Sequence, residues 1–590
     1  MRAISGIVGE EFPDKDIAVA NMLATMKHRG PDHTEVRKVG DHTFLGHNRL
    51  SIIDLHSSVN QPFVSEDDRY TIVFNGEIYN YTELQLQLIP HFSFRTNSDT
   101  EVLLAAYRKW GYQCLDHLIG MFSFAIWDNA ENVLFAACDR FGIKPFYYCE
   151  VNNNLLFASE IKALWAAGIV RARNQKVWSS YFVYGSYGMP DETFWQGIQQ
   201  LPAGHFLILK NGNLRVNRWY NFEERITRIQ PAWSNASESE ITERYLELLH
   251  ESIMLRFRSD VPVGFNVSGG LDSALLISMV KDIFSNNGAI NAFTFTTGNP
   301  DYDELPVVKM LIDATRFPLN NIQLLAKDVP DLAEEMALAQ DEPYGGLPTL
   351  AYASLFKAAR QRNTIVLLEG QGIDEAWAGY DYYQTGSGSV VQGVTGSPFR
   401  PNVFTEEFIK LAERPQYREP FEEKLLNLQF RDLFFTKIPR ALRFNDRISM
   451  KYSTELREPF LDHRLVEMAF ALPTHWKIND NTSKYLLRKI TKNYLSENIR
   501  LAPKRAQETP QGKWLANELR DWADVKINSF ATSEGVNAVK LLGEWDSYCR
   551  HGSDNSFYIW HFINSAMLEN NENVNKYKVY VDVLIKEKKL

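Results

Sequence analysis

One short stretch of the sequence, from Ser268 to Ser273, is rich in glycine and hydroxyl groups and reads Ser-Gly-Gly-Leu-Asp-Ser. Gly269 and Gly270 let the backbone approach a ligand closely, and the N–H groups of such a loop favour an anion. The two serines add hydroxyl donors. Asp272 would repel an anion unless a cation lay between them, so its carboxylate implies Mg²⁺ bridging to a phosphate. The stretch therefore predicts a site for a nucleotide phosphate and Mg²⁺.

The flanking residues predict how this loop is held. The apolar side chains from Val261 to Val267 predict a short strand, and the apolar run from Ala274 to Val280 predicts a helix. The loop lacks the lysine of the G-x-x-x-x-G-K-[ST] motif, which argues against a kinase or GTPase. The candidate ATP-binding residues are Val267, Ser268, Gly269, Gly270, Asp272, Ser273 and Gly370.

A second glycine-rich stretch follows another apolar run, Thr364 to Leu368. It extends from Glu369 to Tyr380 and reads Glu-Gly-Gln-Gly-Ile-Asp-Glu-Ala-Trp-Ala-Gly-Tyr. Asp374 and Glu375 offer the hard oxygen ligands that Mg²⁺ prefers, although a solvated acidic turn would have the same composition.

Two later segments add charge to an otherwise apolar pattern. The segment from Arg440 to Met450 mixes charged and apolar residues, which indicates either ion pairs between helices or a wall of a substrate site. Lys484 lies in a helical pattern. Its ammonium is either solvated or supplies positive charge to an α-phosphate or a developing oxyanion.

The composition excludes several classes of protein. A chain of 590 residues with 45% hydrophobic residues predicts several domains with large cores, and a net charge of −10 without a basic stripe argues against a nucleic-acid partner. The four cysteines lack C-x-x-C spacing, so we expect neither a zinc site nor a disulfide framework, and a cytoplasmic location. Neither an apolar run of about 18 residues nor a secretory signal is present, so no membrane partner is expected. A homodimer is compatible with the sequence.

The order of patterns predicts the domain organisation. Short strand-like runs such as Tyr70 to Phe74, separated by turn signals such as Asn75-Gly76, predict an α+β domain of stacked antiparallel sheets. Further along, strands alternate with helices, which predicts a parallel sheet whose ligand lies beyond the carboxyl ends of its strands. The predicted units are an N-terminal domain of residues 1–215, a polar linker of residues 216–240, an α/β domain of residues 241–525 and a helical extension of residues 526–590.

Together with Tyr302-Asp303-Glu304 and Asp341-Glu342-Pro343, these segments resemble the synthetase half of the asparagine synthetase family. The loop from Ser268 to Ser273 resembles the pyrophosphate loop of the ATP pyrophosphatases, which cleave ATP between its α- and β-phosphates to adenylate a substrate. The resemblance implies ATP and Mg²⁺ as cofactors. It further implies that Asp272, Asp374 and Glu375 hold Mg²⁺ and pyrophosphate, and that Lys484 holds the adenylate and its transition states.

The N-terminal part resembles the class II glutamine amidotransferase domain of the same family, an Ntn-type sandwich of two antiparallel sheets. The motifs that carry this resemblance are His28 to Asp32, Gly46 to Asp54, Phe74 to Asn80 and Thr96 to Glu101. The resemblance implies a glutamine pocket in which Arg49 binds the α-carboxylate of glutamine and Asp99 its ammonium. Asn75 and the Gly76 N–H would form an oxyanion hole, and Glu77 belongs to the same pocket.

The start of the chain departs from that family. The family's nucleophile is a cysteine whose own α-amino group serves as base after the initiator Met is removed. This chain begins Met1-Arg2-Ala3-Ile4-Ser5, and we interpret Ser5 as standing in place of the cysteine. A serine hydroxyl is a much poorer nucleophile than a thiol, so we expect glutamine hydrolysis to be absent or very slow. The alternatives are that cleavage after Ile4 frees Ser5, or that Ser5 is an introduced change.

The synthetase part departs as well. Asparagine synthetases usually read Ser-Gly-Glu/Asp-Gly after the apolar strand, whereas this chain reads Glu-Gly-Gln-Gly from Glu369 to Gly372. Gln371 cannot accept a proton from the incoming amine, and Glu369 is the candidate that could compensate. The stretch from Ala506 to Gly512 also differs from the family's Lys-Gln-Gly-Phe pattern. Both changes border the expected acid pocket, which argues against assuming free aspartate as the acid.

The sequence therefore predicts an ATP-dependent amide synthetase of the asparagine synthetase type. A carboxylate would attack the α-phosphate, pyrophosphate would leave, and ammonia or another amine would displace AMP. The expected partners are small molecules: a carboxylic acid with ammonia, an amine or glutamine. Three alternatives stay open, namely a glutamine-hydrolysing asparagine synthetase, a cyclase like the β-lactam synthetases, and a glutamine-sensing protein without turnover.

Overall fold

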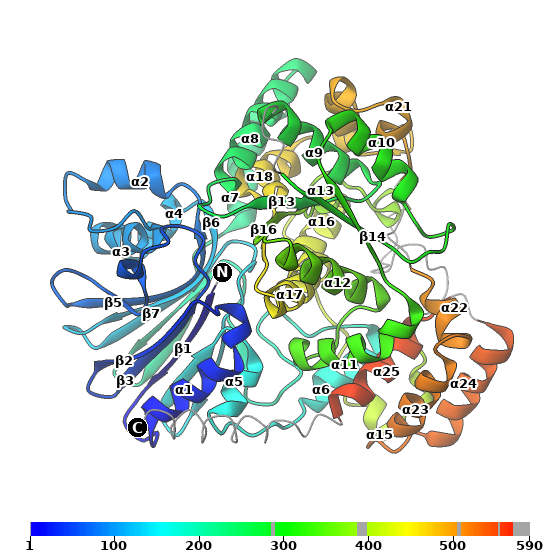
Figure 1. Cartoon of the computed structure of the whole chain (residues 1–590), viewed down its shortest axis with the longest axis horizontal. Helices are drawn as coiled ribbons and strands as arrows, with labels where there is room; N and C mark the ends of the chain where they lie inside the picture. Colours follow the sequence, from blue (N-terminus) through cyan, green and yellow to red (C-terminus); the bar gives the residue numbers. More distant parts are fainter. Residues whose placement is uncertain (1, 285–289, 386–397, 504–508, 553–554, 570–590) are drawn as a thin grey trace.

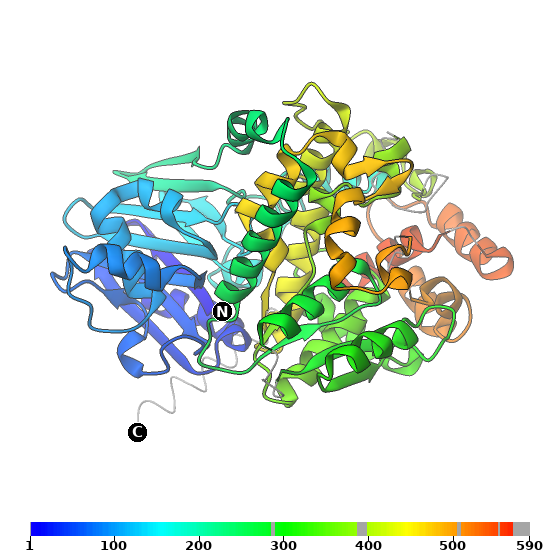
Figure 2. The ribbon, with the colours of Figure 1, turned by 90° about the horizontal axis from the view of Figure 1, so that it is seen from above.

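The computed structural model describes residues 2–284, 290–385, 398–503, 509–552 and 555–569. Its N-terminal part consists of two stacked sheets with helices at their outer faces, and its C-terminal part is built around a parallel sheet (Figure 1). The C-terminal helices lie at the end of the molecule that is remote from the stacked sheets, as a second view shows (Figure 2). This arrangement confirms the predicted fold class.

Both N-terminal sheets are antiparallel. Within the described residues, the first has the strand order β10-β8-β9-β1-β3-β2 and the second has the order β12-β11-β7-β6-β5-β4. The strands of the first sheet are β1 (Arg2–Val8), β2 (His33–Gly40), β3 (Thr43–Arg49), β8 (Tyr147–Val151), β9 (Asn154–Ala158) and β10 (Gln199–Gln200). Those of the second are β4 (Phe63–Val64), β5 (Tyr70–Ile78), β6 (Gly120–Asp128), β7 (Val133–Cys138), β11 (His205–Lys210) and β12 (Asn213–Arg218).

Strand β1 is buried on both faces because it lies between the second sheet and a layer of helices. Ile4 and Val8 pack against residues of the second sheet, whereas Ala3 and Ile7 pack against helix α1 (Lys15–Thr25) and helix α5 (Ile161–Ala166). This alternation follows from the two-residue period of a strand. It also assigns Arg2 to the face of the second sheet and Ser5 to the face of α1.

One turn prediction was wrong. Asn75 and Gly76 lie inside β5, opposite Ser123 and Phe122 of β6. Gly76 has a φ of 148°, and a Cβ atom on it would lie 2.1 Å from the carbonyl oxygen of Met121. The glycine is therefore explained by close approach of two strands and not by a hairpin turn.

The C-terminal part is organised around a five-stranded parallel sheet with the order β15-β14-β13-β16-β17. Its strands are β13 (Val263–Asn266), β14 (Ala292–Thr296), β15 (Leu319–Gln323), β16 (Val366–Leu368) and β17 (Glu455–Arg457). Helices α9 (Leu271–Ile283), α10 (Leu305–Thr315), α11 (Val329–Gln340), α12 (Leu347–Gln361) and α17 (Lys437–Lys451) surround the sheet.

The predicted linker of residues 216–240 contains regular structure. It holds the end of β12, helix α7 (Phe222–Trp233) and the start of helix α8 (Glu238–Arg256). Ser237 begins α8 with a capping box, because its hydroxyl accepts from the Glu240 N–H and the Glu240 carboxylate accepts from the Ser237 N–H. The predicted boundary at residue 525 falls inside helix α23 (Arg520–Phe530).

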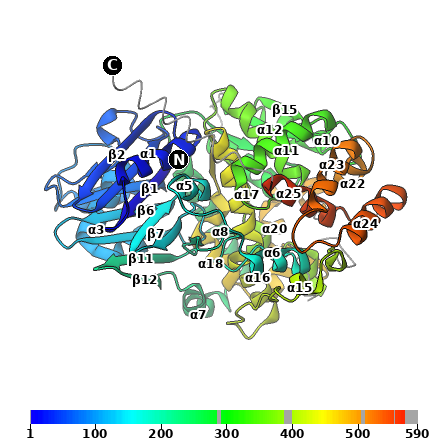
Figure 3. The same ribbon diagram turned by 90° about the horizontal axis from the view of Figure 1, so that it is seen from below.

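A group of C-terminal helices closes the far end of the molecule. It comprises α22 (Gln511–Ala516), α23, α24 (Ala538–His551) and α25 (Phe557–Glu569). Helix α6 (Gln175–Tyr184) of the N-terminal part reaches into this group, where Phe182 packs against Phe530 and Phe562, and Figure 3 shows α6 beside α15 (Glu406–Ile409). Residues 570–590 of the predicted extension lie outside the described residues.

Buried ion pairs join the two parts of the chain. The Arg29 guanidinium, which is fully buried, donates to Glu160 at 2.9 Å and to Asp446 of α17 at 2.9 and 3.2 Å. Glu160 also accepts from the Lys162 ammonium at 2.6 Å, and that ammonium lies 3.2 Å from Asp341.

Along the part of the chain that the structure describes, no helix has the length and apolar character needed to cross a membrane.

Candidate active site

Two loops at the carboxyl ends of neighbouring strands form the centre of the candidate site. Strands β13 and β16 are parallel and adjacent, so the loops after Asn266 and Leu368 emerge at the same edge of the sheet. The Asn266 side-chain amide donates to Glu369 Oε1 at 3.0 Å and connects them. The sequence motifs from Ser268 and from Glu369 are therefore brought together.

The loop from Ser268 to Ser273 has the geometry of an anion site. It leads directly into α9, and the hydroxyls of Ser268 and Ser273 lie 3.0 Å apart. The Gly269 N–H donates to the carboxylate of Glu304 at 3.0 Å, so an anionic oxygen already lies where the loop offers a donor. The side chain of Val267 is buried in the core, which leaves only its backbone for a ligand.

Lys484 links the two loops electrostatically. Its buried ammonium donates to Asp272 Oδ1 at 2.6 Å and lies 2.7 Å from Asp374 Oδ1. Lys484 adopts the left-handed backbone conformation, with φ 53° and ψ 35°, immediately before helix α20 (Tyr485–Ile490). A Cβ atom on Gly379 would lie 2.0 Å from Asp374 Oδ1 and 2.4 Å from Lys484 Cε. The ammonium can thus reach both carboxylates because residue 379 has no side chain.

Glu375 is the third predicted metal ligand and is held separately. Its Oε1 accepts from the Tyr380 hydroxyl at 2.7 Å, whereas its buried Oε2 has no hydrogen-bond partner among the described residues. Burial and the neighbouring Asp374 raise the pKa of Glu375 to about 7. Among the described residues, no three His, Cys, Asp or Glu side chains are grouped closely enough to hold a metal ion by themselves.

Glu369 lies where the sequence suggested a substitute base. Its carboxylate accepts from Asn266 and, at 3.1 Å, from Asn445 of α17. Burial raises the pKa of Glu369 to about 7, although both amide donors favour the ionised form. Gln371 lies two residues further along and, like Gly370, lines the same cavity.

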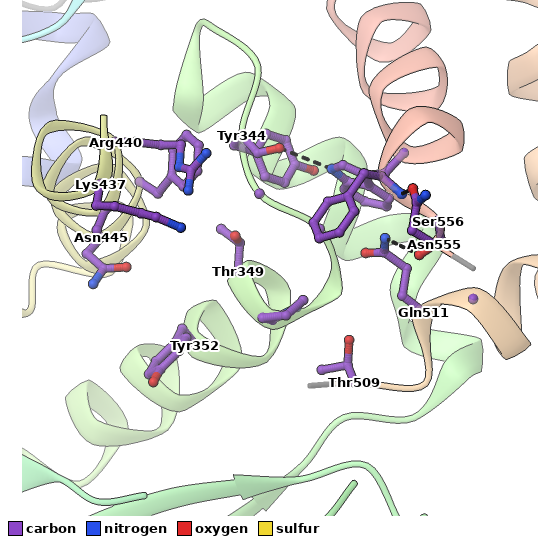
Figure 4. A pocket seen from close by; sticks show the side chains of 18 of the residues that line it. Tyr344, Thr349, Tyr352, Lys437, Arg440, Asn445, Thr509, Gln511, Asn555 and Ser556 are labelled. Carbon is purple, nitrogen blue, oxygen red and sulfur yellow. Dashed lines mark hydrogen bonds between the residues drawn. The ribbon is translucent and has the colours of Figure 1, made fainter. Parts of the chain in front are cut away.

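These groups face a cavity of about 1090 Å³ that extends from the phosphate loop to the C-terminal helices. Figure 4 shows Lys437, Arg440 and Asn445 on one side, Thr349 on helix α12 and Tyr344 on the loop before it opposite, and Gln511, Asn555 and Ser556 beyond them. The volume slightly exceeds the roughly 300–1,000 Å³ that is usual for one small-molecule ligand. It therefore has room for a nucleotide and a second reactant.

The predicted glutamine pocket contains a residue that sequence reasoning overlooked. The Arg2 N–H donates to Asn75 Oδ1 at 3.0 Å, and the Arg2 guanidinium donates to the Thr100 hydroxyl at 3.1 Å. The same guanidinium lies 3.8 Å from Asp99 Oδ1 and 5.2 Å from the centre of the Phe74 ring. Arg2 is 2% exposed, so its positive charge is held against Asp99 inside the protein.

The other predicted pocket residues are close by. Arg49 donates to the carbonyl oxygens of His56 and Asp54 and to Asn60 Oδ1, and burial together with Arg2 lowers its pKa to about 10. Glu77 is fully buried, and within the described part of the chain its carboxylate has no hydrogen-bond partner, although the Arg457 guanidinium lies 3.8 Å away. Burial and the nearby Glu455 raise the pKa of Glu77 to about 8.

Ser5 does not join this pocket. It is fully buried and pairs with Gly46 of β3, and its hydroxyl has no hydrogen-bond partner in the residues that the structure describes. A Cβ atom on Gly46 would contact Ser5 Oγ together with the side chains of Val19 and Leu23, which places Ser5 on the face of α1. The interpretation of Ser5 as the residue at the nucleophile position does not fit this geometry, and Arg2 is the residue beside Asn75.

Comparison with known proteins agrees with this arrangement. A family model described as a glutamine amidotransferase domain matches residues 1–220, and one described as asparagine synthase matches residues 244–570. The chain is 32% identical to asparagine synthetase [glutamine-hydrolyzing] 3 of Bacillus subtilis (strain 168), covering 81% of this chain and 82% of the relative. It is 28% identical to asparagine synthetase [glutamine-hydrolyzing] 1 of the same organism, covering 93% of this chain and 94% of the relative. It is also 27% identical to amidase chyE of Penicillium rubens, covering 89% of this chain and 88% of the relative.

The chain belongs to the asparagine synthase family. It is an asparagine synthetase-like ligase of the kind that forms C–N bonds, with a glutamine amidotransferase domain ahead of the synthase domain. Each family model matches one of the two parts that the fold defines. The amidotransferase model ends at residue 220, just after the end of β12.

Several site residues of this family member had little signal in the sequence. Glu304, Arg440, Asn445 and Gly379 lie inside stretches that the sequence singled out, but nothing there marked them individually. The C-terminal wall formed by Asn555, Ser556 and Trp560 had no motif at all. Residues 506–508, which were expected to border the acid pocket, lie outside the described residues.

Proposed function

We propose that this chain activates a carboxylic acid as its acyl-adenylate and joins it to free ammonia or another amine, without using glutamine. The observation that carries the first half of the proposal is the contact of Lys484 with both Asp272 and Asp374 beside the phosphate loop. A buried ammonium at that place can stabilise the charge that develops on the phosphate as pyrophosphate leaves.

The residues of the two loops suit the first reaction. The carboxylate oxygen of the acid attacks the α-phosphorus of ATP, the bond to the oxygen that bridges to the β-phosphate breaks, and that oxygen keeps the electron pair. Loop N–H groups and the hydroxyls of Ser268 and Ser273 can bind the phosphate oxygens. Gly269, whose N–H already contacts the carboxylate of Glu304, is the donor with a visible anionic partner.

The acidic side chains fit Mg²⁺ on physical grounds. Magnesium usually keeps several waters and takes one or two carboxylates together with substrate phosphates, so a complete protein cage is not required. Asp272 and Asp374 adjoin the loop, and the buried Oε2 of Glu375 lacks a partner. When bound, Mg²⁺ would neutralise the charge on the phosphates.

Glu369 is the residue that suits the second reaction. The amine nitrogen attacks the acyl carbon, the nitrogen gives up a proton, and AMP leaves with the electron pair of the broken C–O bond. A carboxylate with a pKa of about 7 is ionised in part near neutral pH and can accept that proton. Asn266 and Asn445 fix its orientation.

Arg2 supports the absence of a glutamine reaction. Its guanidinium lies against Asp99, where the ammonium of glutamine would bind, and it is neither a thiol nor a hydroxyl. A bound glutamine would have to displace a buried cation from its carboxylate. The Bacillus subtilis relatives are named as glutamine-hydrolyzing, and we propose that this chain differs from them in that respect.

The test of adenylation is acid-dependent exchange of pyrophosphate with ATP. Asp272→Ala should abolish exchange, whereas Asp282→Ala, which removes an exposed carboxylate from the same helix, should leave it unchanged. Exchange that persists in Asp272→Ala would contradict the assignment.

The test of the nitrogen source uses the unaltered chain. Ammonia should support AMP release, glutamine should not, and no glutamate should form. Arg2→Ala should bind glutamine more tightly in calorimetry, because Asp99 is then free to accept its ammonium. Glutamate released from glutamine by the unaltered chain would refute this part. Glutamine binding with no AMP formed from any acid would favour a sensor.

A further inference from the structure

The cavity is far longer than the nucleotide site alone. Beyond Glu369 it passes along helix α17 and ends against the C-terminal helices, where Trp560, Asn555 and Ser556 line it. In Figure 4 the labelled side chains of these elements surround one common space. The end remote from the phosphate loop is therefore where an acid would be recognised.

Arg440 places an uncompensated positive charge at this end. It is half-buried, and its guanidinium lies 5.6 Å from the centre of the Tyr187 ring. Among the described residues, neither a carboxylate nor another hydrogen-bond acceptor contacts it. Arg443, one turn further along α17 and over the same ring at 5.1 Å, pairs with Glu342 at 3.2 Å. A guanidinium held at a cavity without its anion is ready to bind one.

Lys437 lies on the same side but serves a different part of the cavity. Its ammonium lies 4.9 Å from the centre of the Tyr380 ring, and the hydroxyl of Tyr380 donates to Glu375. Burial and Arg440 lower the pKa of Lys437 to about 8. Glu375 is one of the predicted Mg²⁺ ligands, so we assign Lys437 to the phosphates. Arg440 is then the cation that can bind the acid.

Aromatic residues line the cavity on both sides, and among them Tyr344 and Trp560 are almost fully buried. The rings of Tyr344 and Trp560 meet edge to face at 5.7 Å, and the indole N–H of Trp560 donates to the carbonyl oxygen of Tyr344 at 3.1 Å. Phe444 faces the same cavity from α17. Rigid rings of this kind stabilise a flat apolar body far better than a short polar chain such as that of aspartate.

Helix geometry separates the two ends. Asn445 contacts Glu369 at the reacting end, and Arg440 lies five residues earlier on the same helix. At 3.6 residues per turn and 1.5 Å per residue, the two positions lie about 7.5 Å apart along the helix axis and about 140° apart around it. The two side chains therefore line the cavity at separate places, and an acid that contacts both must reach from one to the other.

We propose that the acid taken by this site carries two anionic groups on an aromatic or similarly flat apolar body, with one carboxylate activated beside Glu369 and the second group bound by Arg440. The inference rests on the proposed function, because it names the substrate class of the same reaction. The relatives include proteins named as asparagine synthetases and as amidases, so their similarity does not decide the acid.

The experiment measures AMP release with Mg²⁺, ATP and ammonia for four acids. They are para-phenylenediacetate, which has a ring and two carboxylates, phenylacetate with one carboxylate, adipate without a ring, and aspartate. The first should give the highest kcat/KM. Arg440→Met should lower its kcat/KM by roughly 10- to 100-fold, the range for one charge-assisted hydrogen bond, and should leave phenylacetate unchanged.

Lys540→Met is the matched control, because Lys540 is an exposed cation on helix α24 that is not among the described residues lining the cavity. It should not change the order of the acids. Aspartate or adipate giving the highest kcat/KM would overturn the proposal and leave adenylation intact. An equal loss for all acids in Arg440→Met would overturn the role of that residue. If no acid yields AMP, adenylation itself fails, and calorimetry with the same acids then decides whether the preference exists in binding.

Discussion

Replacing Gly379 with alanine tests the geometry of the candidate site with a single methyl group. The new Cβ would lie 2.0 Å from Asp374 Oδ1 and 2.4 Å from Lys484 Cε, whereas real Cβ contacts are not shorter than 3.0 Å. The carboxylate or the ammonium must therefore move by about 1 Å, the difference between 3.0 and 2.0 Å. Displacement of a reacting group by about 1 Å can lower a rate by about 100-fold.

The expected result is a loss of about 100-fold in acid-dependent exchange of pyrophosphate with ATP. Residue 379 is not in the left-handed region, so alanine is allowed there and the effect is confined to its neighbours. Overpacking costs about 1–3 kcal/mol, so the variant should remain folded at room temperature. Circular dichroism and thermal denaturation check this.

Gly543→Ala is the control. Gly543 lies in helix α24, and a Cβ atom there would meet nothing within 4 Å. Exchange should be unchanged, and the helix should gain up to about 1 kcal/mol from the better helix former. A Gly379→Ala protein that is folded and exchanges pyrophosphate at the unaltered rate would refute the idea that Lys484 must contact Asp374 for adenylation.

Three further predictions follow from charges described above. Arg29→Met should destabilise the chain by roughly 3–5 kcal/mol, seen as a lower Tm, because Glu160 and Asp446 lose a buried partner; an unchanged Tm would contradict this. At fixed free ammonia, AMP release should rise with pH through about 7 as Glu369 ionises, and Glu369→Gln should remove that rise; a rise kept in the variant excludes Glu369 as the base. The raised pKa of Glu369 has the opposite effect on folding. The stability that its protonated carboxyl contributes is fully present below the pKa that this carboxyl has in the unfolded chain. This stability is lost as the pH rises through about 7, the pKa in the folded protein. Removal of Mg²⁺ with EDTA should stop AMP release, and added Mg²⁺ should restore it; turnover that persists in EDTA would contradict the metal assignment.

The convergence of the synthetase loops could be predicted because it follows from topology. Parallel strands place their carboxyl ends at one edge, so a motif after each apolar run must meet its neighbour. Asp272 and Asp374 are brought together in this way, and Lys484 joins them. The apolar run from Thr364 to Leu368 contains strand β16.

Other features could not be predicted because they depend on tertiary contacts. The phase of β1 decides whether Arg2 or Ser5 faces Asn75, and a strand that is buried on both faces has no polar alternation to reveal its phase. Asn75-Gly76 has the composition of a hairpin turn, but close approach of β6 places it inside a strand. The wall formed by Trp560 depends on how a distant helix packs, for which the sequence carries no local signal.

The ion pairs across the domain boundary give the N-terminal part a structural role besides any chemistry of its own. A synthetase half produced alone would present Asp341 and Asp446 without Arg29 and Lys162, and would lose the aromatic packing of Phe182 on Phe530. The two parts then form one thermodynamic unit. Removal of the N-terminal part should therefore give an insoluble product, and expression of residues 238–569 alone tests this. An insoluble product would mean that the first domain is needed for the second to fold, whatever chemistry it performs itself, whereas a soluble folded product would contradict this role.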